Sequence, residues 1–510
     1  MANNAATDSA GNGNGNAAAD SAASSKAAAG NAAAGNAAAG NAAAGNAAAG
    51  NAAAGNAAAG NAGASNAASS NAAASSAASS SAAASNAGAS NAAAGSAAAG
   101  SAAASSAAAG SAAASNADNT VLVIGAGLGG LCLAQGLRKA GIPCEVYERD
   151  SALDARRQGY RLHIDSRGDQ ALRQVLPPHL HELFRATSGQ PRNVTTIYDS
   201  QLEPRTEFVL DDGDVQRNVN RFTLREILFE GLDNVHFGKE FVRYETHENG
   251  VIAHFADGTQ ARGAVLVGAD GVNSPVRRQY LPHAQVVDTG LRQLYGKIPL
   301  TEANRALFDP AMFSVFNIIS GPGKAMIGVA PVDYPEPIAD ACARLAPGVR
   351  LSPDKSYMTC AFGARQEIFG QTDDELRALS GDEMHKLVLD RVSDWHPRVR
   401  RIVESWLPET IFLVSIRTSV PIEPWAPSRV SLVGDAIHAM SPAAGAGANT
   451  AMRDGAALAA ALSSGSPDGI GEYEAEMRRY GFAAVRESAA NGARHLGQNP
   501  LPEISLKPVS

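Results

Sequence analysis

Apolar and polar positions along the larger, C-terminal part of the chain predict both strands and helices. Thr120–Ile124 is a short apolar, β-branched run, which is typical of a buried strand. A glycine cluster follows, and then Leu128–Ala140 has the apolar spacing of a helix that ends at Gly141. Cys144–Glu148 predicts a second strand. These elements form the start of a βαβ unit, the building block of parallel sheets.

The rest of this part predicts further strands around an inserted helical segment. We expect strands at Val235–Glu245, Val251–Phe255, Ala264–Gly268, Gln293–Ile298, Met312–Ile319, Ala325–Ala330, Tyr357–Phe362, Ile411–Ser415 and Arg429–Val433, with Asp257-Gly258 as a hairpin turn. Helices are expected at Arg221–Leu232, Asp373–Leu379, Gly381–Val392, Pro397–Ser405, Ala448–Leu462 and Gly471–Ala490. The sequence therefore predicts an α/β fold with a second, mixed sheet in its middle.

Residues 1–117 have no such pattern. After Met1 they contain no Val, Ile, Leu, Phe, Tyr or Trp, and the unit NAAAG repeats six times from Asn31 to Gly60. A glycine at every fifth position costs a helix about 1 kcal/mol each time. Because nothing larger than Ala is available for burial, ordering this segment has no compensation. We expect a disordered tail that carries no chemistry.

Charge and cysteine content narrow the possible partners. Residues 118–510 carry 41 basic and 48 acidic side chains, which argues against nucleic acid or an anionic membrane as the main partner. No run of 18 apolar residues is present, and the N-terminus does not resemble a signal peptide. The four cysteines lack CxxC spacing (Cys132, Cys144, Cys342 and Cys360). We expect a reduced, cytoplasmic protein without a metal site.

The glycine cluster after the first strand has the GxGxxG spacing of a dinucleotide-binding turn. Gly125 suits the tight turn, Gly127 lets the backbone approach a pyrophosphate, and Gly130 lets the helix pack close to the strand. The free N–H groups of the helix N-terminus favour an anion. Glu148 ends the next strand, in position to accept a hydrogen bond from a ribose hydroxyl. This motif predicts a Rossmann-like domain and leaves FAD and NAD both open.

Two later strands also end in an aspartate. Leu266–Gly271 carries Asp270 into a glycine-flanked turn, which a plain strand-to-helix connection explains equally well. In Val430–Thr450, Asp435 is placed for a sugar-like hydroxyl chain. The turn Gly445–Gly447 then opens a helix whose free N–H groups suit a polarised carbonyl or a developing anion. Elements of the nucleotide-binding type therefore lie on both sides of the middle sheet.

In this order and spacing, the three motifs closely resemble the class A flavoprotein monooxygenases, which have the p-hydroxybenzoate hydroxylase-like fold. The last motif matches the family pattern GDAAHxxxPxxGxGxN, with Ile437 at one Ala position, and the likeness covers 118–490. It implies a Rossmann-like FAD-binding domain split in sequence, an inserted mixed β-sheet substrate domain and C-terminal helices. The implied ranges are a tail (1–117), the first FAD-binding part (118–285), the substrate-binding domain (286–424), the second FAD-binding part with C-terminal helices (425–495) and a short tail (496–510).

The resemblance also implies which residues bind the adenosine half of FAD. The turn that contains Gly125, Ala126, Gly127 and Gly130 would hold the pyrophosphate. Glu148 would bind the ribose, and Arg149 would lie beside the adenine. Arg157 matches an arginine on the FAD phosphates, and Arg221 matches another arginine on the cofactor side.

At the flavin half, the resemblance places two acids and one helix N-terminus. Asp270 belongs to a motif associated with both FAD and NAD(P)H, and Asp435 would bind the ribityl chain. Pro442 would line the flavin face where oxygen reacts. The backbone N–H groups of Gly445, Ala446, Gly447, Ala448 and Asn449 would stabilise negative charge at the pyrimidine end of the ring.

The implied function is an FAD-dependent monooxygenase that consumes NAD(P)H and O₂. It would insert one oxygen atom into a small aromatic or enolic substrate through a flavin hydroperoxide. No second GxGxxG, CxxxxC or WxWxIP motif is present, which argues against Baeyer–Villiger monooxygenases, disulfide reductases and flavin halogenases. Two alternatives remain: an FAD-dependent oxidoreductase of the geranylgeranyl reductase type, which inserts no oxygen, and an inactive flavin-binding scaffold.

No catalytic acid or base can be named from the sequence. His438 is expected to stabilise a turn rather than to act as a base. Arg161 and His163 share one face of an expected strand, where they contact flavin or substrate, or else pair structurally. We expect Cys132 to be buried between its helix and the sheet.

Overall fold

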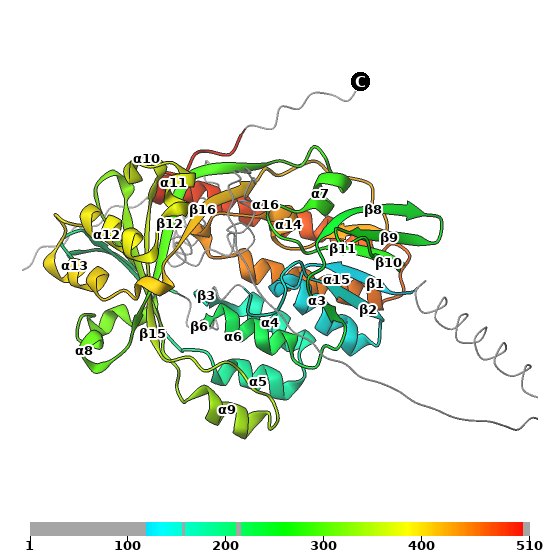
Figure 1. The fold of residues 1–510 in the computed structure, drawn as a ribbon, viewed down its shortest axis with the longest axis horizontal. Helices are drawn as coiled ribbons and strands as arrows, with labels where there is room; N and C mark the ends of the chain where they lie inside the picture. The colour runs from blue at the N-terminus through cyan, green and yellow to red at the C-terminus, as the bar shows by residue number, and fades with distance from the viewer. Residues whose placement is uncertain (1–118, 156–158, 211–215, 503–510) are drawn as a thin grey trace, which may run out of the picture. The chain divides into compact units, whose positions relative to one another are not determined.

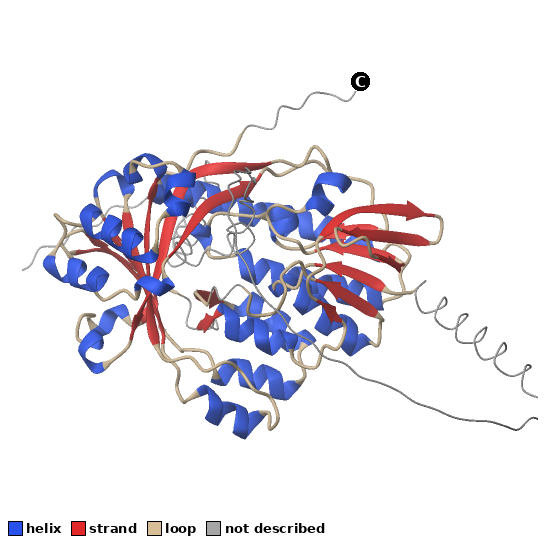
Figure 2. Ribbon diagram, viewed as in Figure 1, coloured by secondary structure: helices blue, strands red, loops and turns tan. Residues whose placement is uncertain are grey.

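The computed structural model describes residues 119–155, 159–210 and 216–502. The predicted tail and Arg157 lie outside these residues. Figure 1 shows the course of the chain and Figure 2 its helices and strands. Among the described residues, no helix combines the length and apolar character that crossing a bilayer requires.

The first sheet is parallel and joins strands from both ends of the patterned region. Its order is β17-β11-β1-β2-β7, with β1 at Val121–Ile124, β2 at Cys144–Tyr147, β7 at Val235–His236, β11 at Val265–Gly268 and β17 at Val430–Leu432. All four pairings are parallel. β17 lies beside β11 although more than 150 residues separate them in sequence. The prediction of a Rossmann-like domain split in sequence is therefore confirmed.

Two long helices complete this domain. α3 (Leu128–Ala140) follows β1 directly and matches the predicted range, while α15 (Gly447–Ser463) packs across it. The close approach depends on small residues, since a Cβ on Gly455 would lie 2.7 Å from the Gly129 carbonyl oxygen. The Sγ of Cys132 donates to the Met452 carbonyl (3.3 Å). Cys132 is thus buried, as expected, but its polar contact is with α15 rather than the sheet.

The second sheet has seven strands in the order β16-β12-β15-β14-β13-β4-β5. The strands are β4 (Arg192–Asp199), β5 (Pro204–Val209), β12 (Val286–Pro299), β13 (Ser314–Ser320), β14 (Met326–Val332), β15 (Tyr357–Arg365) and β16 (Phe412–Ser419). Only β13 and β4 run parallel, so the sheet is mixed, as predicted. It also recruits residues 192–209, outside the range 286–424. The domain boundaries stay a prediction.

Each face of the seven-stranded sheet belongs to a different core. Leu294 and Phe362 pack with α11 (Asp373–Ala378), α12 (Gly381–Arg391) and α13 (Pro397–Glu404), the helices that flank the sheet in Figure 2. On the opposite face, alternate residues such as Tyr295 and Phe316 belong to the core shared with the parallel sheet.

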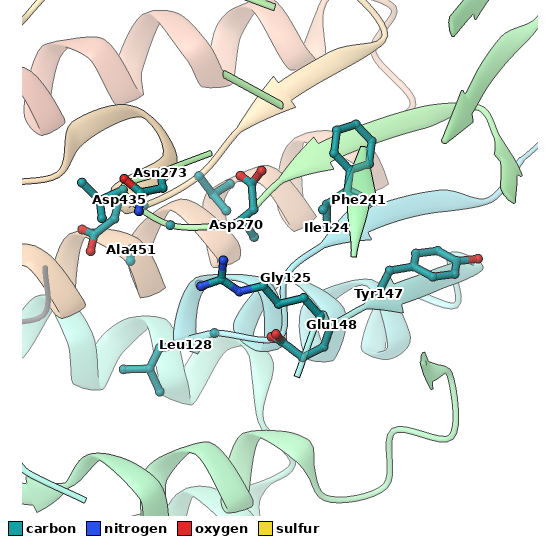
Figure 3. A pocket seen from close by; sticks show the side chains of 18 of the residues that line it. Ile124, Gly125, Leu128, Tyr147, Glu148, Phe241, Asp270, Asn273, Asp435 and Ala451 are labelled. Carbon is teal, nitrogen blue, oxygen red and sulfur yellow. The ribbon is translucent and has the colours of Figure 1, made fainter. Parts of the chain in front are cut away.

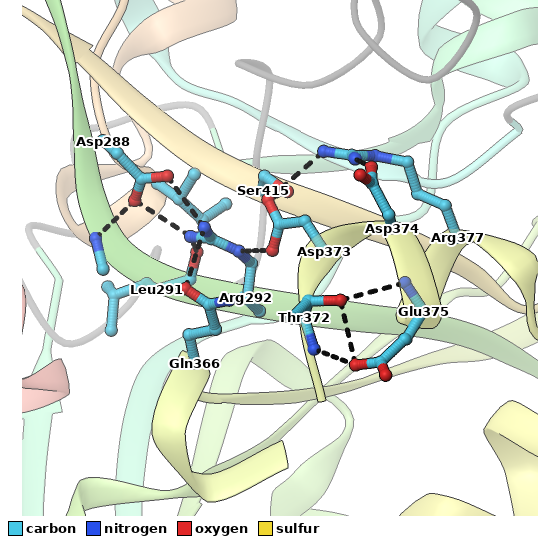
Figure 4. Close-up of polar contacts among 12 residues, drawn as sticks. Asp288, Leu291, Arg292, Gln366, Thr372, Asp373, Asp374, Glu375, Arg377 and Ser415 are labelled. Carbon is cyan, nitrogen blue, oxygen red and sulfur yellow. Dashed lines mark hydrogen bonds and ion pairs between the residues drawn. The ribbon is translucent and has the colours of Figure 1, made fainter. Parts of the chain in front are cut away.

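A buried arginine connects α11 to the seven-stranded sheet (Figure 4). Arg292 on β12 contacts Asp288 (2.8 Å) and Asp373 (2.5 Å), and Ser415 on β16 donates to the second oxygen of Asp373 (3.0 Å). Thr372 caps α11 in a reciprocal box with Glu375. These contacts position the helix layer on the sheet.

Two smaller sheets and the remaining helices surround the cores. β3 (Arg161–Ile164) pairs antiparallel with β6 (Arg217–Asn220), and β8 (Phe241–His247), β9 (Gly250–Phe255) and β10 (Gln260–Gly263) form a three-stranded sheet. The helices are α4 (Ser166–Val175), α5 (Pro178–Ala186), α6 (Arg221–Phe229), α7 (Pro275–Tyr280), α8 (Glu302–Arg305), α9 (Ile338–Leu345), α10 (Gln366–Phe369), α14 (Asp435–His438) and α16 (Gly469–Leu496).

The hairpin turn at Asp257-Gly258 is confirmed, because Thr259 N donates to the Asp257 carboxylate and Gly258 has a φ of +82°. The prediction of a single strand at Val235–Glu245 is wrong. This segment divides into β7 and β8, which belong to different sheets, because Gly238 turns the backbone with a φ of +71°.

Candidate cofactor site

A cavity of about 590 Å³ opens at the carboxyl ends of β1, β2, β11 and β17 (Figure 3). Ligands of parallel α/β sheets bind at this edge, and the volume is within the range of small-molecule sites. Nine residues expected from the sequence line it: Gly125, Gly127, Glu148, Arg149, Arg221, Asp270, Asp435, Gly447 and Ala448. Residues from both halves of the split domain thus meet around one cavity.

The glycine-rich turn has the geometry that its spacing predicts. Gly125 has a φ of +111°, and a Cβ there would lie 2.4 Å from the Ala269 carbonyl oxygen. A Cβ on Gly130 would lie 2.1 Å from the Gly125 carbonyl oxygen, so that only glycine lets α3 approach β1 this closely. Among the described residues, a Cβ on Gly127 would meet no atom within 4 Å beyond its chain neighbours, because this residue faces the cavity. No side chain caps α3, and its first N–H groups are available to an anion.

Glu148 lies at the end of β2 and is held by the backbone. Its Oε2 accepts from Ala126 N (2.9 Å) and its Oε1 from Asp150 N (3.0 Å). Each oxygen keeps acceptor capacity for a further donor, as a ribose hydroxyl would supply. The carboxylate therefore joins the glycine turn to the second strand at the rim of the cavity.

Arg225 is a buried cavity residue that sequence reasoning missed. Its Nε donates to the Ala126 carbonyl (2.9 Å), its Nη1 to the Leu153 carbonyl (2.8 Å), and its Nη2 lies 3.6 Å from Glu148. It lies one helical turn after Arg221 on α6, and both arginines line the cavity. This i, i+4 spacing was the available signal.

Asp270 and Asp435 enter the cavity from two different strands (Figure 3). Burial raises the pKa of each carboxyl from 3.8 to about 6. This effect outweighs the hydrogen bonds that Asp270 accepts and, for Asp435, the nearby charges of His438 and Arg221. Asp270 accepts from Val276 N (3.2 Å) with one oxygen, whereas its Oδ1 has no partner among the described residues. Buried acceptors of this kind suit hydroxyl or N–H donors of a bound molecule.

The N-terminus of α15 contributes backbone rather than side chains. Gly447 and Ala448 line the cavity, and no side chain caps the helix. Asn449 is fully buried and fastens this end to β3: its Nδ2 donates to the His163 carbonyl (3.0 Å), and its Oδ1 accepts from Asp165 N (3.1 Å). The first turn of α15 is therefore held in place with its N–H groups toward the cavity.

The other expected residues lie beside the cavity rather than on its wall. The residues that line the cavity do not include Ala126, Gly130, Gly445, Ala446 and Asn449, each of which lies within two positions of a lining residue in the sequence. Pro442 borders a separate, narrow space against the seven-stranded sheet. Residues on the wall that the sequence did not indicate include Tyr147, Lys239, Phe241, Asn273 and Arg278.

Arg161 bridges β3 to the second sheet. Its Nη2 donates to Asn218 Oδ1 (2.6 Å) and to the Val315 carbonyl (2.5 Å), and its guanidinium lies 5.6 Å from the Phe316 ring centre. The structure thus shows structural pairing for Arg161, while a contact of Arg161 or His163 with flavin or substrate stays a prediction. Burial lowers the pKa of His163 to about 3, so it is neutral.

Comparison with known proteins identifies the family. A family model described as an FAD binding domain matches residues 118–285 and 408–488. The FAD-dependent monooxygenase phnB of Penicillium herquei is 30% identical over 412 residues, which cover 75% of this chain and 92% of that protein. A structure titled as a putative FAD-containing monooxygenase from Photorhabdus luminescens is 33% identical, covers 73% of this chain and 98% of that one, and has a TM-score of 0.64. The chain belongs to the FAD-dependent monooxygenases.

Another relative is a longer protein. The dual O-methyltransferase/FAD-dependent monooxygenase CTB3 of Cercospora beticola is 33% identical over 415 residues. These cover 76% of this chain and 47% of that protein, so the chain spans about half the length of this relative.

Proposed function

We propose that this chain is a monooxygenase that binds FAD in the 590 Å³ cavity and consumes NAD(P)H and O₂. The observation that carries the proposal is the meeting of the glycine turn with Glu148, Asp270 and Asp435 at one sheet edge. These groups match the parts of FAD in order: an N–H-rich turn for the pyrophosphate, and acids for the ribose and ribityl hydroxyls.

Each element then has a defined role. The turn from Gly125 to Gly130 binds the phosphates, Glu148 accepts from the ribose, and Asp435 accepts from the ribityl chain. With FAD held by these groups, the cofactor would supply hydride acceptance from NAD(P)H and electron transfer to O₂, the chemistry by which one oxygen atom enters the substrate and the other leaves as water. The N-terminus of α15 stabilises negative charge on the ring through its N–H groups.

We place the organic substrate between Pro442 and the face of the seven-stranded sheet that belongs to the shared core. Gln293, Met326 and Gly363 border a narrow space with Pro442. Gln293 is buried, and its Nε2 has no partner among the described residues, so it suits a carbonyl or phenolic oxygen. Close by in the sheet, Tyr295 stacks on Phe412 at 5.3 Å. The chemistry of these side chains suits an aromatic or enolic substrate, and the space itself, at about 10 Å³, would have to widen to admit one.

The test begins with the absorption spectrum of the full chain, before and after FAD addition and gel filtration. Flavin bands that survive filtration would support the cofactor assignment, and a folded protein that stays colourless would refute it. Phenolic compounds are then screened for stimulated NAD(P)H oxidation. A product that gains one oxygen atom supports the monooxygenase. Turnover without oxygen gain would favour the reductase alternative, and no turnover over a broad panel would favour the scaffold.

A further inference from the structure

The turn that presents Asp435 to the cavity is held by a buried carboxylate behind it. β17 ends at Leu432, and the backbone reverses at Gly434, whose φ is +62°. The side chain of Asp454, on α15, is fully buried there and is absent from the cavity wall. No function described above uses it.

One oxygen of Asp454 binds both ends of this turn. Its Oδ2 accepts from Gly434 N (2.7 Å) and from His438 Nε2 (2.6 Å). These two donors precede and follow Asp435, so that a single acceptor holds the backbone before it and the His438 side chain after it. Burial lowers the pKa of His438, but the charge of Asp454 outweighs this effect and the pKa is raised overall. The raised pKa favours the protonated imidazole, the form that makes the stronger hydrogen bond to a carboxylate.

The second oxygen serves a different element. Asp454 Oδ1 accepts from the hydroxyl of Tyr480 on α16 (2.6 Å). The two oxygens of Asp454 thus have different contacts: Oδ2 holds the turn that contains Asp435, and Oδ1 joins α15 to α16.

The same helix also lines the cavity. Gly447, Ala448 and Ala451 of α15 lie on its wall, and Asp454 follows Ala451 by one turn. The turn packs tightly on this helix, since a Cβ on Gly434 would lie 2.9 Å from the Cβ of Ala451. The bonds to Asp454 therefore fix Asp435 and the N-terminus of α15 relative to each other.

We propose that Asp454 is a positioning residue for the cofactor: through Gly434 and His438 it sets the orientation in which Asp435 meets the ribityl chain. This inference rests on the proposed function, because it takes FAD as the occupant of the cavity. Asp454 itself would touch no cofactor atom, but it would determine how tightly Asp435 binds FAD.

The test measures FAD dissociation constants of the full chain by flavin fluorescence. Asp454→Asn replaces one acceptor oxygen by an amide NH₂, and we expect FAD binding to weaken at least tenfold. Tyr480→Phe is the matched control, since it removes only the bond to Oδ1. It should change the dissociation constant less than threefold, although it lowers the unfolding temperature of the FAD-free protein.

A double-mutant cycle with Asp435→Asn tests the route of the effect. If Asp454 acts through Asp435, adding Asp454→Asn to Asp435→Asn should weaken FAD binding by less than a further threefold. The visible circular dichroism of bound flavin should change in Asp454→Asn and stay unchanged in Tyr480→Phe. If Asp454→Asn fails to fold, His438→Ala replaces it, with at least a threefold loss of affinity and the same spectral change.

Three results would overturn the inference. They are equal losses of affinity in Asp454→Asn and Tyr480→Phe, additive effects in the cycle, and normal FAD affinity in a folded variant that lacks the Oδ2 bonds. Absence of FAD binding by the unmodified chain would instead refute the proposed function, and the inference with it.

Discussion

Alanine at two glycines of the GxGxxG turn should have opposite consequences. At Gly130, the added Cβ would lie 2.1 Å from the Gly125 carbonyl oxygen and 3.1 Å from the Cβ of Ala269. Helix α3 would have to retreat by about 1 Å to restore normal packing. It cannot do so freely, because a Cβ on Gly129 would already lie 3.1 Å from the Ala451 carbonyl oxygen on the α15 side.

The magnitudes follow from these contacts. Overpacking a rigid core costs about 1–3 kcal/mol, and the better helix propensity of Ala returns up to about 1 kcal/mol. Because the clash at Gly130 is with backbone, we expect Gly130→Ala to lower the free energy of unfolding by about 2 kcal/mol. A Cβ on Gly127 meets no atom of the described part of the chain within 4 Å beyond its chain neighbours, so Gly127→Ala should change stability by less than about 1 kcal/mol. Its methyl group projects into the cavity and should weaken FAD binding at least tenfold.

Urea unfolding of the FAD-free variants and FAD titration by fluorescence measure the two effects separately. Gly130→Ala should mainly lower the free energy of unfolding, and Gly127→Ala should mainly lower the affinity for FAD. Equal behaviour of the two variants in both measurements would refute the geometry of the turn. Normal FAD affinity in Gly127→Ala would show that no phosphate approaches this backbone.

Four further predictions concern charged groups. FAD affinity should fall as the pH drops below about 6, because Asp270 and Asp435 have pKa values raised to about 6 and each loses an acceptor when protonated. FAD titrations between pH 5 and 8 measure this fall. Asp435→Asn should flatten the dependence of FAD affinity on pH. The stability of the FAD-free protein should change with pH in the opposite direction. Because folding raises the pKa of Asp270 and of Asp435, these carboxyls lower the free energy of unfolding as the pH rises from about 4 to 6. Urea unfolding at several pH values measures this change. Asp373→Asn should lower the free energy of unfolding by about 2 kcal/mol without changing FAD affinity, since it removes an acceptor from the buried Arg292. The control Asp374→Asn changes a side chain that is 96% exposed and should have almost no effect on the free energy of unfolding. Arg225→Met should weaken FAD binding about tenfold by releasing the turn and Glu148; unchanged affinity would show that its bonds serve folding alone.

The motifs predicted which segments meet at the cavity, while the roles of their residues stay predictions. α3 has the predicted range, and the glycines and acids of three distant segments meet at one cavity. These motifs could be recognised in the sequence because each one depends on local backbone geometry at the end of a strand. Arg225 was missed because its i, i+4 spacing from Arg221 shows only that both arginines lie on one face of the helix, and gives no sign of what Arg225 contacts. The aromatic wall formed by Tyr147 and Phe241 brings together separate sheets, a relation that no local pattern encodes.

Long-range pairing limited the prediction of the second sheet. Its central strands were expected, since their alternating or apolar runs are local signals. The addition of β4 and β5 was not expected, because strand partners are chosen by tertiary packing. The division of Val235–Glu245 had the same origin: Gly238 is only one residue in a strand-like run, yet it redirects the backbone from one sheet to another.

The pairing of β17 with β11 has a consequence for the order of events on the ribosome. When residue 268 has emerged, β11 can pair with β1, but its other edge has no partner until Val430–Leu432 is synthesised, more than 150 residues later. At about 5–20 residues per second, that interval lasts on the order of ten seconds or more. During this time an apolar strand edge invites pairing with other chains. Among the segments that line the cavity, Asp435 and α15 are synthesised last, shortly after β17, so the nascent chain closes its strand edge and completes its cofactor cavity at nearly the same time.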